Sequence, residues 1–334
     1  MRAPEKNNNY HNKRLLVTGA SGFLATNLIK ELSGVMCYIR RLSRCSSPFM
    51  PVSGSAVIED MTGDITGEEI WQSALEDIDI VFHFAAQTSV SAANDDPVTD
   101  FAANVLPLLH LLETCRRKRL HPVVLFAGTV TEAGVTSGFP VDETHSDNPV
   151  TVYDLHKLMA ETYLKYYVRQ GMVRGAALRL ANVYGPGPAS SGADRGILNR
   201  MIKKAISGEA LTIYGHGNYM RDYVFVNDVV DAFLYAGADI DRLNGRHYII
   251  GSGEGHTVAE AVHLIAKCVE EKCGRAVPVE YVDPPEALSP IEERNFVADT
   301  KNFSSATDWT ARASLAEGID LTIDYFSGIM KEVS

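Results

Sequence analysis

The sequence predicts an α/β fold in which a doubly wound parallel sheet is followed by a smaller C-terminal region. Two observations lead to this prediction. Up to about residue 182, short apolar runs alternate with longer amphipathic stretches, and a glycine-rich turn follows the first apolar run. Such alternation is typical of parallel strands that are joined by right-handed helical crossovers. With 334 residues, the chain can form one large domain or two closely joined domains.

Each element of this part of the chain is predicted from its apolar pattern. Short continuous apolar runs are typical of buried strands, whereas apolar residues three or four positions apart are typical of helices. Along the chain, we expect strands at 15–17, 35–39, 80–84, 123–127 and 176–180, and helices at 23–32, 70–75, 101–117 and 152–170.

Charge and composition exclude several classes of function. The formal net charge of −11 argues against general binding to nucleic acid or to acidic membranes, because no basic surplus exists to neutralise phosphates. Residues 1–13 are polar, lack an apolar signal-peptide core and are expected to be a flexible leader. No apolar run approaches the ~20 residues that span a bilayer, and the five cysteines complete no metal-binding pattern. We therefore expect a cytoplasmic protein without a metal site.

A glycine turn between the first strand and the first helix predicts a dinucleotide site. Gly19 and Gly22 let the backbone turn tightly and let a pyrophosphate approach the helix N-terminus, whose N–H groups favour anions. Ala25 stands where a third glycine is often found, and it is small enough for close packing. The fold is therefore predicted to be of the Rossmann type, with further cofactor contacts from Ser21, Phe23 and Leu24.

The end of the second strand is expected to select between NAD and NADP. An acid at this position accepts from the ribose 2′-hydroxyl of NAD, whereas an arginine suits the 2′-phosphate of NADP. Arg40 and Arg41 stand here without a nearby acid, which favours NADP; two solvated arginines are the equally weighted alternative. Other cofactor contacts are predicted at the ends of later strands: Asp64 (to the adenine amino group), Ile65, Ala85 and Ala86.

Tyr153 and Lys157 are the candidate catalytic pair. Positions i and i+4 of a helix share a face, so the Lys157 ammonium is expected beside the Tyr153 phenol, where it favours the phenolate. A phenol with an ordinary pKa of about 10 can then act as an acid/base nearer to neutral pH. The spacing alone occurs by chance in many helices, so its weight depends on the motifs around it.

Beyond Asn182 the pattern becomes less regular. Residues 184–192 are rich in turn-forming residues. We expect a dinucleotide-binding domain at 14–182 with return segments near 222–252, and a mainly substrate-binding region at 183–334. The elements predicted in this region are helices at 197–207, at 258–269 and from Leu315, and strands at 211–214, 222–226, 247–250 and 277–282.

Several further motifs occur in a fixed order along the chain. They include 83–90 (HFAAQTSV), 96–97 (DP) with Asn104, 179–187 (RLANVYGPG), 214–217 (YGHG), 221–228 (RDYVFVND), 292–299 (EERNFVAD) and 308–309 (DW). With the glycine turn and the Tyr153–Lys157 pair, they resemble the extended short-chain dehydrogenase/reductase family. The resemblance is to its nucleotide-sugar epimerases and dehydratases in particular, and it runs from about Arg14 to the C-terminal helix.

This resemblance implies a role for each matching residue. Thr129, just after the strand expected at 123–127, would hydrogen-bond the reacting oxygen of the substrate, Tyr153 would exchange its proton, and Lys157 would bind the nicotinamide ribose. The resemblance also implies an NAD(P) cofactor, a nucleotide-diphosphate sugar as substrate and a homodimer formed through the helices at 101–117 and 152–170. The remaining implied site residues are Asn104 (bracing the cofactor side of the site), Thr88 and Asn182 (sugar nucleotide), and Arg221 and Arg294 (diphosphate).

One departure from the family pattern narrows the chemistry. The 4,6-dehydratases carry an Asp-Glu pair directly after the catalytic threonine, whereas Val130 and Thr131 stand here. Glu132 lies one residue further, and on a strand such a shift turns a side chain to the other face. Dehydration is therefore disfavoured.

Two chemistries at a sugar carbon and one non-catalytic role remain. We expect first an epimerase that works through a transient keto sugar, most simply at C4, with NAD. A NADPH-dependent reductase of 4-keto sugar nucleotides is the alternative favoured by Arg40 and Arg41. A dinucleotide-binding scaffold without catalysis is the third reading, against which the Thr129, Tyr153 and Lys157 set argues.

Overall fold

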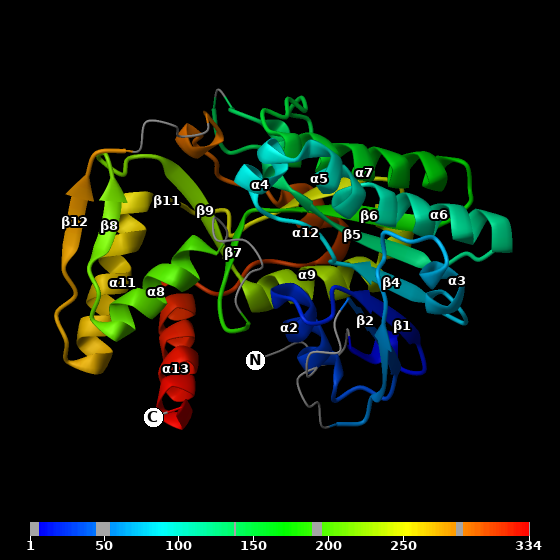
Figure 1. Ribbon diagram of the computed structural model, residues 1–334, viewed down its shortest axis with the longest axis horizontal. Helices are drawn as coiled ribbons and strands as arrows, with labels where there is room; N and C mark the ends of the chain where they lie inside the picture. Colours follow the sequence, from blue (N-terminus) through cyan, green and yellow to red (C-terminus); the bar gives the residue numbers. More distant parts are fainter. Residues whose placement is uncertain (1–6, 45–53, 137, 189–195, 285–289, 334) are drawn as a thin grey trace.

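A seven-stranded sheet forms the centre of the computed structural model, which describes residues 7–44, 54–136, 138–188, 196–284 and 290–333 (Figure 1). The strands run in the order β10-β6-β5-β4-β1-β2-β3, and all neighbouring pairs are parallel. Strand order therefore reverses at β1, as in a doubly wound Rossmann-type sheet. The strands are β1 (Arg14–Thr18), β2 (Tyr38–Ser43), β3 (Val57–Thr62), β4 (Ile80–His83), β5 (Val123–Thr129), β6 (Arg174–Leu180) and β10 (His247–Ile250).

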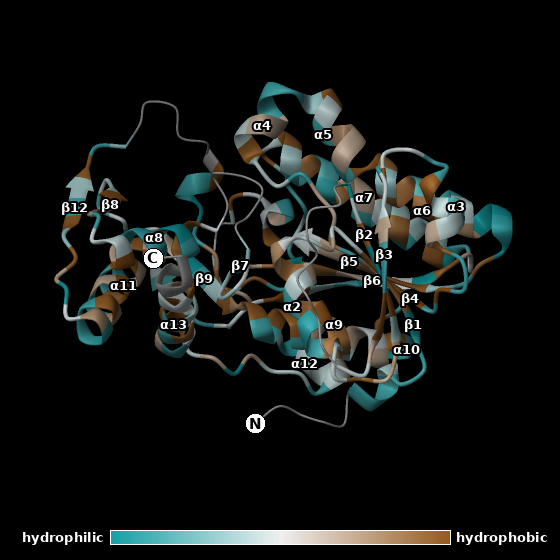
Figure 2. Ribbon diagram, turned by 60° about the horizontal axis from the view of Figure 1, so that its bottom comes forward, coloured by the Kyte–Doolittle hydropathy of each residue, from teal (hydrophilic) through white to brown (hydrophobic). Residues whose placement is uncertain are grey.

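Helices cover both faces of this sheet, because its strands are apolar on both sides (Figure 2). Leu15 and Val17 of β1 belong to one hydrophobic core, and Leu16 belongs to the other. The first core takes in α2 (Phe23–Leu32), α9 (Val226–Ala238), α10 (Ile240–Leu243) and α12 (Lys301–Thr307); the second takes in α3 (Ile70–Ala74), α6 (Leu106–Lys118) and α7 (Val152–Arg169).

A third hydrophobic core holds the more irregular C-terminal region together. It is built from one long terminal helix, two further helices and the strands beside them. Two small sheets, β11-β9-β7 and β12-β8, lie in this region (Figure 1). Its elements are β7 (Asn182–Tyr184), α8 (Ile197–Ser207), β8 (Leu211–Tyr214), β9 (Met220–Phe225), β11 (Gly255–Thr257), α11 (Val258–Cys273), β12 (Val279–Val282) and α13 (Leu315–Val333). Between them, α9 and β10 return to the central fold.

Two elements differ from the sequence prediction. The second strand lies at Tyr38–Ser43 instead of 35–39, because two arginines that look like a strand end are buried within it. The single helix predicted at 101–117 is two helices, α5 (Pro97–Asn104) and α6, which are separated at Val105. Pro107 explains the break, since a proline ring cannot continue a helix that already runs through the preceding turn.

The part of the predicted leader that the structure describes is not a flexible arm: the short helix η1 (Asn8–Tyr10) buries Tyr10 in the first core, where its hydroxyl donates to the Leu234 carbonyl at 2.7 Å. Within the described residues, no helix is long and apolar enough to cross a bilayer. No group of three or more His, Cys, Asp or Glu side chains in that same part of the chain could hold a metal ion. The short elements are η1 (Asn8–Tyr10), α4 (Val90–Asp95), η2 (Val130–Ala133) and η3 (Pro290–Glu293).

Candidate active site

The carboxyl edge of the sheet collects most of the predicted site residues. Because parallel strands end at the same edge, the turn after β1 and the segments after β4 and β5 meet there. The Thr18 hydroxyl accepts the Ala85 backbone N–H at 3.2 Å, which joins the end of β1 to the segment after β4. Thr129 ends β5, and the first turn of α7 carries Tyr153.

The glycine turn fits a dinucleotide. Gly19 adopts a φ of +64°, and a Cβ on it would lie 2.9 Å from the backbone N and Cα of Ala85. Gly22 is the N-cap of α2, so the free N–H groups of the first turn of this helix face the same edge. Ala25 is fully buried, as expected for a small residue at the helix–sheet contact. The turn therefore brings the backbone close enough to approach a pyrophosphate.

Replacing Gly19 tests this fit. In Gly19→Ala we expect lower stability, because an L-residue in the left-handed region costs about 1–2 kcal/mol and its Cβ meets the Ala85 backbone. Dinucleotide binding should fall as well, since the turn must move. Thermal unfolding and calorimetric titration with NAD measure both effects. Gly34→Ala is the matched control, because a Cβ at Gly34 meets nothing within 4 Å; equal behaviour of the two variants would contradict the assigned role.

Arg40 and Arg41 do not stand at the end of a strand, which corrects the sequence prediction. Both lie inside β2 and are buried. Arg40 Nε donates to Glu59 at 2.6 Å and its Nη1 donates to three backbone carbonyls around α3, and Arg41 pairs with Asp60 at 2.6 Å. The two guanidinium groups thus join β2 to its neighbours, and the argument from them for NADP no longer holds.

Ser43 and Arg44 occupy the position at the end of β2 instead. The Ser43 hydroxyl lies 3.1 Å from the Ser21 hydroxyl of the glycine turn, and Arg44 is exposed. Asp64 follows β3 and is exposed, with one carboxylate oxygen accepting from the Thr66 N–H and hydroxyl at 2.9 Å. These hydrogen bonds lower the pKa of Asp64. The backbone carbonyl of the buried Ile65 accepts a hydrogen bond from the Trp71 indole N–H, so its assigned part here is structural.

Tyr153 and Lys157 share one face of the first turns of α7. The Thr151 hydroxyl caps this helix by accepting the Asp154 N–H at 3.2 Å. Both side chains are buried, and the Lys157 ammonium lies 4.1 Å from the centre of the Phe126 ring on β5. Burial, together with the Lys157 charge, lowers the pKa of nearby His83 to about 3, so this imidazole is neutral. The positive charge of Lys157 is therefore held against β5, close to His83 at the end of β4.

The residues after Thr129 form a helical turn and not a strand. Val130–Ala133 is the 3-10 helix η2, so the argument that Glu132 faces away because of strand alternation is wrong. Glu132 folds back instead, and its carboxylate accepts the Thr129 N–H at 2.9 Å. The Thr129 hydroxyl lies 2.8 Å from that of Thr131, which in turn donates to Asp154 at 2.5 Å. These bonds hold Thr129 against the turn that carries Tyr153.

A buried arginine lies behind Thr129 between two buried carboxylates. Arg179 Nε is 3.1 Å from Glu132, and its Nη2 is 2.7 Å from Glu161; all three side chains are almost completely buried. Burial and the neighbouring Glu161 raise the pKa of Glu132. Burial alone would also raise that of Glu161, but the hydrogen bonds and charge of Arg179 lower it to about 2. Asp147, whose side chain is 32% exposed, also pairs with Arg179 at 2.5 Å, and the ionised Glu161 and Arg179 form the charged core of this cluster.

Asn104 belongs to a second buried network, one that braces the loop after β4. Its amide donates to the Gln87 carbonyl at 3.0 Å and to Asp100 at 2.9 Å. Asp100 also accepts from Gln87, and its other oxygen lies 2.7 Å from His156 of α7. The network thus ties α5 and α7 to the loop that contains Thr88. This supports the expected bracing role of Asn104, while nothing in these contacts brings it to the cofactor directly.

The three predicted substrate residues of the C-terminal half lie on or beside the β7–β9 sheet. Asn182 donates to the Asp222 carbonyl at 3.1 Å. Arg221 donates to the backbone carbonyl of Arg294, so the two buried guanidinium-bearing residues are neighbours. The ion pair of Arg221 with Glu292 is long, at 4.0 Å, and the Glu292 side chain is 54% exposed. Both guanidinium groups also donate to backbone carbonyls, Arg221 to Glu292 and Arg294 to Ile291, so part of their hydrogen-bonding capacity is already used within the protein.

The loop after β7 contacts the start of α2, directly after the glycine turn. Asn27 of α2 donates to the Pro186 carbonyl at 2.9 Å, and Gly187 packs against the Phe23 ring. Phe23 therefore contacts the loop that the sequence marks by its turn-forming residues at 184–192. Residues 189–195 of this segment lie outside the described part of the chain.

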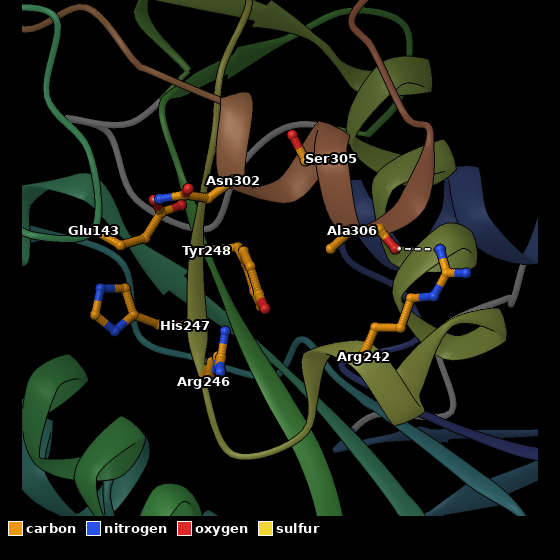
Figure 3. A pocket seen from close by; sticks show the side chains of 8 residues that line it. All are labelled: Glu143, Arg242, Arg246, His247, Tyr248, Asn302, Ser305 and Ala306. Atoms are coloured by element: carbon orange, nitrogen blue, oxygen red, sulfur yellow. Dashed lines mark hydrogen bonds between the residues drawn. The ribbon is translucent and has the colours of Figure 1, made fainter.

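A pocket of about 350 Å³ lies elsewhere, between β10 and α12 (Figure 3). It is lined by His247 and Tyr248 of β10, and Arg242 at its rim donates to the Ala306 carbonyl. His247 begins β10, whereas Ile250 at the other end of this strand is next to Leu180, which pairs with Thr129. The pocket thus opens at the amino edge of the sheet, away from the candidate active site.

Sequence reasoning missed several residues of the site. The Tyr153–Asp154 dipeptide signals a carboxylate beside the candidate catalytic pair, but which residue this carboxylate meets depends on the path of residues 130–133. Glu132, Arg179 and Glu161 come from three distant elements, so no local spacing could group them. Asp100 and His156 likewise meet only because α5 and α7 pack together.

Proteins of one family are similar to this chain in sequence and in fold. A family model described as the NAD dependent epimerase/dehydratase family matches residues 15–251. The chain is 29% identical to a UDP-glucose 4-epimerase of Mycolicibacterium smegmatis, over 94% of this chain and 98% of that protein. It is also similar to the UDP-glucose 4-epimerase of Thermotoga maritima solved with UDP-glucose, at 29% identity and a TM-score of 0.83, over 95% of this chain and 99% of that one. The Thermus thermophilus UDP-glucose 4-epimerase in complex with NAD is 29% identical, with a TM-score of 0.81, over 94% and 99% of the two chains.

Proposed function

Because the chain belongs to the NAD-dependent epimerase/dehydratase family, we propose that it is a nucleotide-sugar epimerase that acts through a transient keto sugar at C4. One observation carries the proposal: Thr129 at the end of β5 is linked through Thr131 and Asp154 to the helical turn of Tyr153. The similar proteins named for UDP-glucose 4-epimerisation support a UDP-hexose as substrate.

Each of the site residues has a separate role in this proposed reaction. Tyr153 accepts the proton of the sugar hydroxyl and returns it later, and the buried ammonium of Lys157 favours the phenolate that this requires. Thr129 hydrogen-bonds the same oxygen, while Glu132 fixes its backbone. The bound nicotinamide would accept the hydride of the sugar carbon and give it back. Arg221 and Arg294 would bind the diphosphate and leave the sugar free to present its other face.

Dehydration stays disfavoured on the geometry of η2. In this turn Thr131 carries a hydroxyl, and the Glu132 carboxylate is directed to Arg179 and to the Thr129 N–H. The carboxyl pair that a 4,6-dehydratase needs beside the sugar is therefore not assembled by these residues. The family description covers dehydratases as well as epimerases, so this difference bears directly on the reaction type.

A NADPH-dependent reductase of 4-keto sugar nucleotides is the second candidate, favoured by the end of β2. Leu42, Ser43 and Arg44 offer a hydroxyl and an exposed cation and no acid, a composition that suits a 2′-phosphate. The dinucleotide released from purified protein by denaturation distinguishes the two. Bound NAD supports the epimerase, whereas an empty protein that consumes NADPH stoichiometrically with a 4-keto sugar nucleotide contradicts it.

We also propose a homodimer through α7 and the neighbouring α6. Leu155 and Tyr166 are 45% and 49% exposed, and with Met159 and the exposed Thr162 they form a mainly apolar stripe along one face of α7. Residues with this spacing on a helix suit packing against a second copy.

Charge placed in that stripe should break the dimer. We expect Leu155→Asp to sediment as a monomer in analytical ultracentrifugation, because dimerisation would bury the new carboxylate. Leu321→Asp on α13 is the control, since Leu321 is similarly exposed at 50% but lies on the C-terminal helix. A wild-type chain that is already monomeric, or a Leu155→Asp protein that remains dimeric, would contradict the proposed interface.

A further inference from the structure

Asp154 is a buried carboxylate beside the catalytic tyrosine for which the reaction outlined above has no use. It is completely buried, and it lies in the first turn of α7, where the positive end of the helix dipole favours a negative charge. Its Oδ1 accepts the hydroxyl proton of Thr131 at 2.5 Å. The Thr131 oxygen is in turn 2.8 Å from the hydroxyl oxygen of Thr129. A continuous chain of hydrogen bonds therefore runs from the carboxylate to the proposed catalytic hydroxyl.

The donor and acceptor in each of these hydrogen bonds follow from the number of protons available. A carboxylate can only accept, and each hydroxyl has one proton to donate. Since the Thr131 proton goes to Asp154, the bond between the two hydroxyls must be donated by Thr129. The Thr131 backbone N–H also points to the Thr129 oxygen at 3.3 Å and occupies one of its lone pairs. Thr129 then has one lone pair left, and no proton, for a further partner.

We propose that Asp154 is a positioning residue that acts through Thr131 to make Thr129 a hydrogen-bond acceptor towards the sugar. A hydroxyl on the reacting carbon can donate to such a group, whereas a keto oxygen cannot. The sugar hydroxyl has one proton, which it donates to Thr129 on binding and must turn to Tyr153 before the carbon is oxidised; once the carbon is a ketone, the contact with Thr129 is lost. A loosely held keto sugar can rotate in the site and present its other face to the cofactor, as epimerisation requires. This inference rests on the proposed function.

A sugar nucleotide that cannot donate at C4 tests the direction of the hydrogen bond. In 4-deoxy-4-fluoro-UDP-glucose, fluorine replaces the hydroxyl and can accept weakly but never donate. We expect the wild-type protein to bind this analogue about tenfold more weakly than UDP-glucose in calorimetric titrations, the loss typical of a buried acceptor left without its donor. Because Tyr153 can also accept from the same hydroxyl, the decisive comparison is between variants of Thr131.

Thr131→Val and Thr131→Ser form the matched pair. Valine keeps the shape of threonine but has no hydroxyl, so it interrupts the series of hydrogen bonds and leaves the Thr129 proton free to turn towards the ligand. Serine keeps the hydroxyl. We expect the preference for UDP-glucose over the fluoro analogue to fall to about twofold or less in Thr131→Val and to stay near the wild-type value in Thr131→Ser. Asp154→Leu removes the acceptor at the far end and should behave like Thr131→Val, which provides a second test if one variant folds poorly.

The outcomes separate this inference from the function on which it rests. Equal affinity of wild-type protein for the two nucleotides, or the same preference in Thr131→Val as in Thr131→Ser, would overturn the inference alone. A folded protein that binds neither nucleotide would contradict the proposed function, and the inference would fall with it. Thermal unfolding midpoints of all variants show that the compared proteins are folded.

Discussion

Tyr153→Phe is expected to lower the turnover of the sugar nucleotide by about 10²–10⁴-fold, the contribution typical of a positioned general acid/base. The phenol oxygen is the only atom removed, and the ring stays buried in the first turn of α7. Affinity for the sugar nucleotide should change little, since that binding is assigned to other groups such as Arg221 and Arg294. Initial rates by product chromatography and affinities by calorimetry measure the two quantities separately.

Tyr166→Phe is the control for this experiment. Tyr166 lies on the same helix but is 49% exposed, so loss of its hydroxyl should leave turnover unchanged. A Tyr153→Phe protein with wild-type turnover would remove Tyr153 from the reaction. It would also revive the reading of the chain as a non-catalytic dinucleotide-binding scaffold.

Arg179→Met should be the most destabilising of the substitutions considered. The side chain of Arg179 lies between the carboxylates of Glu132 and Glu161, both fully buried. Arg179 also pairs with Asp147, and without the guanidinium Glu161 loses the partner that keeps it ionised away from water; breaking a buried ion pair typically costs about 3–5 kcal/mol. We expect a loss of this size in the free energy of unfolding, measured with urea near neutral pH. The loss should shrink as the pH falls from the ordinary pKa of a glutamate towards the value of about 2 for Glu161, because the ion pair with Arg179 then no longer stabilises the wild-type fold.

Arg169→Met near the end of α7 is the matched control. Arg169 is exposed, and surface substitutions away from special features usually change stability by less than about 0.5 kcal/mol. If Arg179→Met is no less stable than Arg169→Met, the charged cluster behind Thr129 does not stabilise the fold. The support that it gives to Glu132 and to the Thr129 backbone would then have to come from elsewhere.

The sequence was sufficient to predict the fold because its signals are local. The bounds of α2 were predicted to the residue, since Gly22 ends the turn and the apolar spacing persists to Leu32. The course of β2 was not, because Arg40 and Arg41 look like surface residues until their ion pairs with β3 are known. The break between α5 and α6 could have been read from Pro107, whose effect on a helix is independent of tertiary contacts.

The candidate site was predictable in part, for the same reason. Residues such as Thr129, Tyr153 and Lys157 are recognised from the motifs in which they stand. The structure adds the contacts of the strand and the helix to which they belong. The helical turn after Thr129 carries no such signal, and its path decides where Glu132 and Thr131 point. The groups that hold Thr129 come from β6 and α7, far away in sequence, so they were found only from the packed structure.

Isotope tracing at the sugar carbon tests the central claim most directly. UDP-glucose with deuterium at C4 would be incubated with the protein and NAD, and the products followed by proton NMR. An epimerase that works through a transient 4-keto sugar should form the C4 epimer, UDP-galactose, with deuterium still at C4 and no net reduction of NAD. Loss of deuterium from C4, or unchanged UDP-glucose in the presence of bound NAD, would contradict the account.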